Sequence, residues 1–234
     1  MLSRLLLVAG SLAFLTGMVV AGEETPPNTL TEAEKAEGFR LLFDGQTLKG
    51  WRGYRKQTCP EGWQVIDGAI TRVANAGDII TEEQFGQFEF RFQWRVDPGA
   101  NSGVMYHVTE KHPHPWNTGP EYQILDNKKH ADGRNLKTSA ASLYGLIAPS
   151  RDVTRPAGEW NDGVIRIQGQ HVEHWLNGVK VLEYNKGGEE WDKMIAASKF
   201  KAMPDFGKPT KGHINLQDHG DRVAYRNLRI KILD

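Results

Sequence analysis

Apolar residues recur at every second position along most of the chain from residue 39 onward. In the clearest example, FGQFEFRFQWRV, the alternation places Phe88, Phe90, Phe92 and Trp94 on one side of an extended segment and charged or amide side chains on the other. Alternation of this kind indicates β-strands, and sustained helical periodicity is nearly absent. The pattern therefore predicts an all-β domain, a sandwich of two antiparallel sheets.

Turn residues divide the pattern into elements. GWQVIDGAITRV reverses at an Asp-Gly dipeptide and predicts a hairpin, and GVIRIQGQHVEHWLNGVKVLEY contains two such turns and predicts three strands. GHINLQDHG and RVAYRNLRIKIL predict a closing pair of strands. Only GGEEWDKMIAASKF has helical spacing, through Trp191, Met194 and Ile195, and we interpret it as a lid or connector rather than part of the core.

The first residues have the organisation of a secretory signal. Residues 1–21 contain Arg4, then an apolar stretch that is short for a membrane span, then small residues where cleavage can occur. A polar segment, 22–38, with Thr31 as a helix cap predicts a linker, and the folded domain is expected at 39–234. We expect export to a bacterial periplasm or the cell exterior, without stable membrane insertion after cleavage.

Composition limits the partners of the domain. The chain has 234 residues, 39% of them hydrophobic and 25% charged, which suits one globular domain with a sizeable core. The formal net charge is zero and the basic residues are dispersed, so neither nucleic acid nor an anionic membrane surface is an expected partner. The single cysteine, Cys59, cannot form an internal disulfide.

Two strand segments carry polar side chains where a sheet would usually bury apolar ones. In GPEYQILDN, Glu121 and Gln123 share one face, and in GHINLQDHG a histidine, an asparagine and Gln217 share another, followed by His219. Buried groups of this kind require hydrogen-bond partners. Amides, imidazoles and carboxylates beside an aromatic ring recognise sugars, and Trp116 is available to provide that ring.

The chain resembles the 3-keto-disaccharide hydrolase family, whose domain is also described as a 3-keto-glucoside 1,2-lyase and 3-keto-2-hydroxy-glucal hydratase. The resemblance rests on seven segments in order: FRLLFDGQTLKGW, GANSGVMYHV, GPEYQILDN, SLYGLIAP, GEWNDGVIRIQGQHVEHWLNGVKVLEY, SKFKAMPDFG and GHINLQDHGDRVAYRNLRIKIL. It implies a concanavalin A-like (laminin G-like) jelly roll with sugar chemistry on a concave sheet. The implied reaction cleaves 3-keto-glucosides by C1–O β-elimination and hydration.

That reaction needs a base near C2, a donor or cation at the developing enolate oxygen, and an acid at the departing oxygen. We predict Glu121 and His219 for the proton transfers, without assigning which is base and which acid. The enolate oxygen is assigned to Gln123, Arg226 or a bound divalent cation such as Ca, Mg or Mn. Arg226 has the alternative of a structural ion pair with Asp218 or Glu121.

The remaining candidates are predicted to bind the carbohydrate substrate. They are Asn101, Gln217, Asp126, His107 and Trp116. Asn101 is equally explained as a turn residue and His107 as a satisfied buried imidazole. A divalent cation among Glu121, Asp126 and backbone oxygens is a further alternative.

Two other classes of protein fit the same residues. A non-catalytic carbohydrate-binding module of this fold would bind glycans and tolerate substitution of Glu121 and His219. A paired-carboxylate glycosidase would require an acidic residue at position 123, where an E-x-D-x-x-E strand has one and this chain has glutamine.

Overall fold

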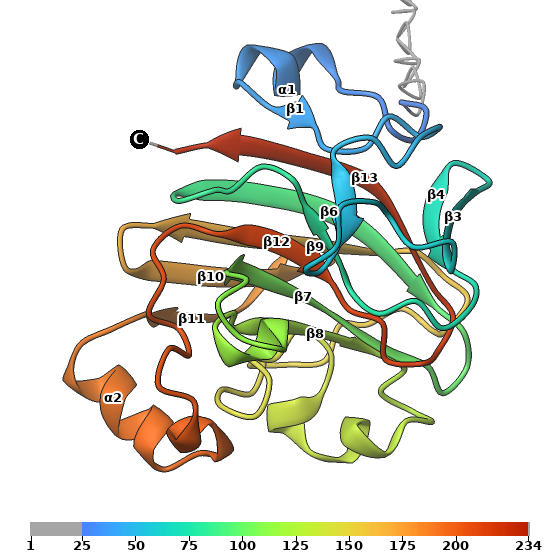
Figure 1. Ribbon diagram of the computed structural model, residues 1–234. Helices are drawn as coiled ribbons and strands as arrows, with labels where there is room; N and C mark the ends of the chain where they lie inside the picture. The colour runs from blue at the N-terminus through green and yellow to red at the C-terminus, as the bar shows by residue number, and fades with distance from the viewer. Residues whose placement is uncertain (1–24, 234) are drawn as a thin grey trace, which may run out of the picture.

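Figure 1 shows the computed structural model of the protein, which describes residues 25–233. The predicted signal peptide, residues 1–21, lies outside the described residues. Between residues 25 and 233, every helix is too short or too polar to cross a membrane.

The domain is a β-sandwich of two antiparallel sheets (Figure 1). The larger sheet has the order β11-β10-β9-β6-β13-β4-β3, with β1 also paired to β13. Its strands are β1 (Arg40–Leu41), β3 (Trp63–Ile66), β4 (Ala69–Arg72), β6 (Phe88–Val96), β9 (Asn161–Gln168), β10 (His171–Leu176), β11 (Val179–Asn185) and β13 (Val223–Ile232). The smaller sheet has the order β2-β5-β12-β7-β8. Its strands are β2 (Trp51–Gly53), β5 (Ile79–Thr81), β7 (Asn101–Val108), β8 (Glu121–Leu125) and β12 (His213–Leu216).

Sequence alternation predicts the larger sheet well. Along β6 every second residue is buried and the residues between them are partly exposed. The hairpin β3–β4 and the meander β9–β10–β11 have the predicted pairings. The predicted all-β, jelly-roll sandwich fold is confirmed.

The predicted pairing of the last two strands is wrong. β12 pairs with β5 and β7 in the smaller sheet, whereas β13 pairs with β4, β6 and β1 in the larger sheet. Alternation identifies both strands but carries no information about the neighbour of each. The chain therefore crosses between the sheets just after Leu216, and this crossing carries Gln217, Asp218 and His219.

Aromatic side chains and paired hydroxyls hold the two sheets together. The Phe92 ring on β6 lies 5.4 Å from the Tyr122 ring on β8, edge to face. The Tyr122 hydroxyl donates to the Trp175 carbonyl on β10, and the Tyr106 hydroxyl lies 3.0 Å from His174 Nε2. These hydroxyls are buried yet partnered, so they do not carry the cost of an unsatisfied polar group.

Between residues 25 and 233, two α-helices lie at the edges of the sandwich. Helix α1 (Glu32–Ala36) begins after the predicted cap, Thr31, which forms a capping box with Glu34, and Glu34 also pairs with Arg229 of β13. Helix α2 (Glu189–Ala196) connects β11 to a short 3-10 helix, η4 (Lys199–Ala202). Its Trp191 is buried and stacked on Tyr184, so the expectation that this segment has no part in the core is wrong.

Candidate functional site

A polar cavity opens on the outward face of the smaller sheet. Along β7, Ser102, Val104 and Tyr106 point into the sandwich, which leaves Asn101 and Gly103 on the outward face. The cavity has a volume of about 460 Å³. It is lined by Asn101, Trp116, Glu121, Gln123, Tyr144, Lys199, Phe200, Met203, Gln217, Asp218 and His219.

The carboxyl of Glu121 fills the space that Gly103 leaves open. In the β7–β8 register Met105 lies opposite Glu121 and Gly103 opposite Gln123, so the Glu121 side chain extends diagonally across β7. A Cβ atom at Gly103 would lie 2.1 Å from Glu121 Oε1. Glu121 is 8% exposed, and within residues 25–233 no hydrogen bond reaches its carboxyl. Gly103 thus makes room for a carboxyl group to which no residue in the described part of the chain donates a hydrogen bond.

The pKa of Glu121 is raised to about 8, chiefly by burial and secondly by the negative charge of Asp78, while the positive charge of Lys199 opposes the shift. Asp78 is itself buried, which raises its pKa to about 6. Its carboxyl accepts hydrogen bonds from the Asn215 side chain and the Asp218 backbone. The charge of Asp78 thus acts on Glu121, and of these two acids Glu121 is the one that lines the cavity.

Amide side chains surround this carboxyl. The Oδ1 atom of Asn101 and the Oε1 atom of Gln217 are buried and have no hydrogen-bond partner among the described residues. Gln123 Oε1 accepts from the Ile124 backbone, which leaves its Nε2 group as the donor available to the cavity. Buried polar atoms in native proteins are normally satisfied, so these amides are suited to a ligand rich in hydroxyl groups.

Asp218 fixes the loop that carries His219. Its Oδ1 atom accepts from Arg72 Nε and the Gly220 backbone, and its Oδ2 atom accepts from the Ala76 and Gly77 backbone. Burial opposes the charge, but these hydrogen bonds and Arg72 hold the pKa of Asp218 below its ordinary value. Both carboxylate oxygens of Asp218 are therefore occupied by hydrogen bonds that hold the loop, and neither is free to act on a ligand.

Aromatic and cationic side chains form the rim. Trp116, on the 3-10 helix η1 (Pro115–Asn117), is 37% exposed and stacks on His114 with 4.3 Å between ring centroids. The exposed His219 ring lies edge-on to His130, 6.2 Å away. Lys199 Nζ lies 4.0 Å from the centroid of the Tyr144 ring.

Besides Asp218, which was considered only as an ion-pair partner of Arg226, sequence reasoning missed four residues of the cavity: Tyr144, Lys199, Phe200 and Met203. All four fall in SLYGLIAP and SKFKAMPDFG, two of the segments that carry the family resemblance. Neither segment has a strand pattern that shows which side chains face the sheet. The resemblance itself was therefore the available signal for these residues.

Six of the nine predicted site residues line the cavity, and three do not. Asp126 follows β8 and accepts from the Gly99 and Lys128 backbone, so it holds a turn. Arg226 belongs to β13 in the other sheet, where it donates to Gln93 and lies 4.2 Å from the Trp160 ring. His107 is buried and its Nε2 atom bonds the Gly86 carbonyl. The expectation that these three contact the same ligand as Glu121 disagrees with their positions.

The alternative of a structural ion pair between Arg226 and Asp218 or Glu121 is not observed either. Asp218 pairs with Arg72, and within residues 25–233 no hydrogen bond reaches the Glu121 carboxyl. A cation held by Glu121 and Asp126 together is not favoured either, because Asp126 is occupied by backbone donors outside the cavity.

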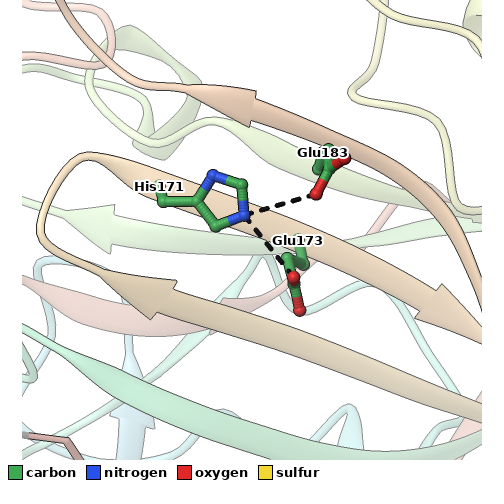
Figure 2. A group of neighbouring side chains, drawn as sticks. All are labelled: His171, Glu173 and Glu183. Carbon is green, nitrogen blue, oxygen red and sulfur yellow. Dashed lines mark ion pairs between the residues drawn. The ribbon is translucent and has the colours of Figure 1, made fainter.

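Among the described residues, one group of side chains has the spacing of metal ligands, and it lies on the β10–β11 hairpin (Figure 2). His171 Nε2 is 3.5 Å from Glu173 Oε1 and 3.4 Å from Glu183 Oε2. Lys180 Nζ reaches the same two carboxylates, at 3.3 and 2.7 Å. The Lys180 ammonium thus takes the position that a metal ion would have between the two carboxylates. We interpret the group as a surface ion-pair network outside the cavity.

A sandwich fold with an amide-lined cavity, a buried acid and an exposed aromatic ring has the features of a carbohydrate-active protein. The chain belongs to the 3-keto-alpha-glucoside-1,2-lyase-like domain family, whose model matches residues 38–231.

Similar proteins agree with this assignment. The chain is 36% identical over 231 residues to the 3-keto-disaccharide hydrolase of Bacteroides thetaiotaomicron, a match that covers 85% of this chain and 80% of that protein. It is also similar to two crystal structures of candidate glycosyl hydrolases from Parabacteroides distasonis. One has 35% identity and a TM-score of 0.83 and covers 89% of this chain and 100% of the other. The second has 28% identity and a TM-score of 0.66 and covers 83% and 99%.

Proposed function

We propose that this protein cleaves 3-keto-glucosides by C1–O β-elimination followed by hydration, with net hydrolysis. The family membership and the Bacteroides relative support a carbohydrate substrate that carries a 3-keto group. The observation that carries the proposal is the Glu121 carboxyl, which is buried, has a pKa raised to about 8 and lacks a hydrogen bond from the described residues. Perturbed acids of this kind concentrate at catalytic sites.

The proposed reaction begins with the removal of a proton from C2. The C3 carbonyl acidifies the hydrogen on C2, and the Glu121 carboxylate removes it as a proton, leaving an enolate on the C3 oxygen. The electron pair then returns to form the C1=C2 bond as the C1–O bond breaks, and His219 protonates the departing oxygen. Water adds to C1 of the resulting enone and a proton returns to C2, which gives the free 3-keto sugar.

The surroundings of Glu121 suit the base role. A carboxylate whose conjugate acid has a pKa of about 8 is a stronger base than an ordinary carboxylate, and part of it is ionised near neutral pH. Gln123 Nε2 and Lys199 both line the cavity as a donor and a cation for the enolate oxygen. These two replace Arg226, which lies on the other sheet.

Paired-carboxylate hydrolysis fits the cavity less well. That mechanism needs two functional carboxyl groups across the glycosidic bond. Asp218, the other acid lining the cavity, already accepts four hydrogen bonds. Elimination needs only one free carboxyl, and Glu121 provides it.

The test is product release by the purified protein from a 3-keto-glucoside and from its unoxidised parent, measured side by side with and without EDTA. We expect cleavage of the keto-sugar alone. Cleavage of the parent as well would indicate a conventional glycosidase, and cleavage of neither would indicate a non-catalytic carbohydrate-binding module. Loss of activity in EDTA would add a divalent cation to the site.

The space above Gly103 provides a second prediction. Gly103→Ala would place a methyl group where the Glu121 carboxyl lies, and we expect it to lower kcat/KM by about 10²-fold, because a displacement of about 1 Å can cost this much. Gly86→Ala is the matched control, since a Cβ atom there meets only the Thr210 carbonyl, at 3.6 Å. Equal activity of the two variants would contradict the assigned position of the base.

A further inference from the structure

A second cavity, of about 550 Å³, lies beside the first. It is formed by the end of β11, helix α2 and the segment after η4, and Met203 lines both cavities. Three lysines line it, Lys186, Lys201 and Lys208, against a single acid, Asp192. The side chains that line the second cavity therefore carry a net positive charge, although the formal net charge of the whole chain is zero.

Lys186 is a buried cation whose hydrogen-bond partners among the described residues are His107 and a backbone carbonyl. It is 6% exposed, and its Nζ atom donates to His107 Nδ1 at 2.7 Å and to the Pro209 carbonyl. No carboxylate lies within ion-pair distance of Lys186 in the described part of the chain. Burial lowers the pKa of Lys186 to about 8. The pKa of His107 is lowered to about 4, mainly by burial and secondly by the charge of Lys186. At neutral pH the lysine therefore carries the positive charge and the histidine is neutral. A buried charge without a counter-charge is costly.

The backbone is distorted to bring His107 to this lysine. In the β7–β12 pairing, His213 lies opposite Val108 but Asn215 lies opposite Met105, so β7 has an extra residue at this point. His107 sits in this bulge with φ of 54°, in the left-handed region that residues other than glycine rarely adopt. Bulges redirect side chains, and strain of this kind concentrates at functional positions.

We propose that the second cavity is a binding site for a small anionic ligand, whose carboxylate or sulfate group pairs with Lys186. The exposed Lys201 and Lys208 stand at its mouth and add charge-assisted contacts. The ligand supplies the counter-charge that the protein omits. This site is separate from the proposed elimination chemistry, and its test does not depend on that activity.

The test is thermal unfolding of the full chain during titration with sodium sulfate or sodium glucuronate, with sodium chloride and glucose as controls. A ligand that binds the folded state raises Tm in a saturable manner. We expect saturation with sulfate, glucuronate or both, and none with chloride or glucose. Saturation with both identifies recognition of the anion alone, whereas glucuronate without sulfate identifies an acidic sugar.

Variants localise the effect. Lys201→Gln and Lys208→Gln should each weaken the affinity by about tenfold, the size of one charge-assisted contact. Lys129→Gln, an exposed lysine outside both cavities, should leave it unchanged. Lys186→Met should abolish the saturable rise in Tm. If the Lys186→Met variant does not fold, the affinities of Lys201→Gln and Lys208→Gln test the proposal. A shift that is linear in sulfate and equal in all variants would reflect general exclusion of sulfate from the protein surface. Either that result or no shift at all would overturn the proposal.

Discussion

Glu121→Gln is expected to lower kcat/KM for a 3-keto-glucoside by about 10³-fold, within the range that a general base contributes. Glutamine has nearly the same shape and retains the contacts of the side chain, but it cannot accept the proton from C2. Initial rates with the purified variant measure the loss. Glu159→Gln, an exposed acid outside the cavity, is the control and should be fully active.

The same role predicts the pH dependence of the wild-type protein. The base acts as its ionised form, so kcat/KM should rise with pH through a pKa of about 8, which burial of Glu121 sets. A paired, solvated carboxylate would complete this rise several units lower. A flat profile from pH 6 to 9, or an active Glu121→Gln variant, would remove Glu121 from the proton transfer.

Local patterns predicted the fold to the level of strands and hairpins. The β6 alternation and the turns of the β9–β11 meander are local features, and the structure confirms them. The pairing of β12 and β13 was wrong because strand partners are chosen by packing across the whole sandwich. Either strand satisfies the same local pattern in either sheet.

The site was predictable where strand geometry determined it. Glu121 and Gln123 lie on β8 and Gln217 directly follows β12, and the alternation of polar with apolar residues in these two segments predicts all three. Arg226 alternates equally well, but its strand belongs to the other sheet, which the sequence does not reveal. Lys199 reaches the cavity because α2, anchored by Trp191, places η4 against the smaller sheet, and this is a tertiary effect.

The buried acid should also cost the protein stability. Glu121 lies among amides and aromatic rings at 8% exposure, and no described residue donates a hydrogen bond to its carboxyl. Water solvates the same carboxyl fully in the unfolded chain. The proposed role of Glu121 as catalytic base would account for the retention of such a group, since strained or unsatisfied active-site groups commonly reduce stability.

Glu121→Gln is therefore expected to be the more stable protein at alkaline pH, although it is the inactive one. The pKa of Glu121 is about 8 in the folded state, against 4.5 for an unperturbed glutamate, so between these values the folded protein binds more protons than the unfolded chain. Wild-type stability thus falls as pH rises through this window, by up to about 5 kcal/mol in total. Glutamine does not titrate, so the pH dependence of the difference in unfolding free energy reports the ionisation of Glu121 together with its coupling to Asp78. Urea denaturation at pH 5 and pH 8 measures this difference, and the stability advantage of the variant should be several-fold larger at pH 8.

A difference that does not change with pH would show that Glu121 ionises as freely in the folded protein as in the unfolded chain. That result is incompatible with the proposed role of Glu121 as a base with a raised pKa.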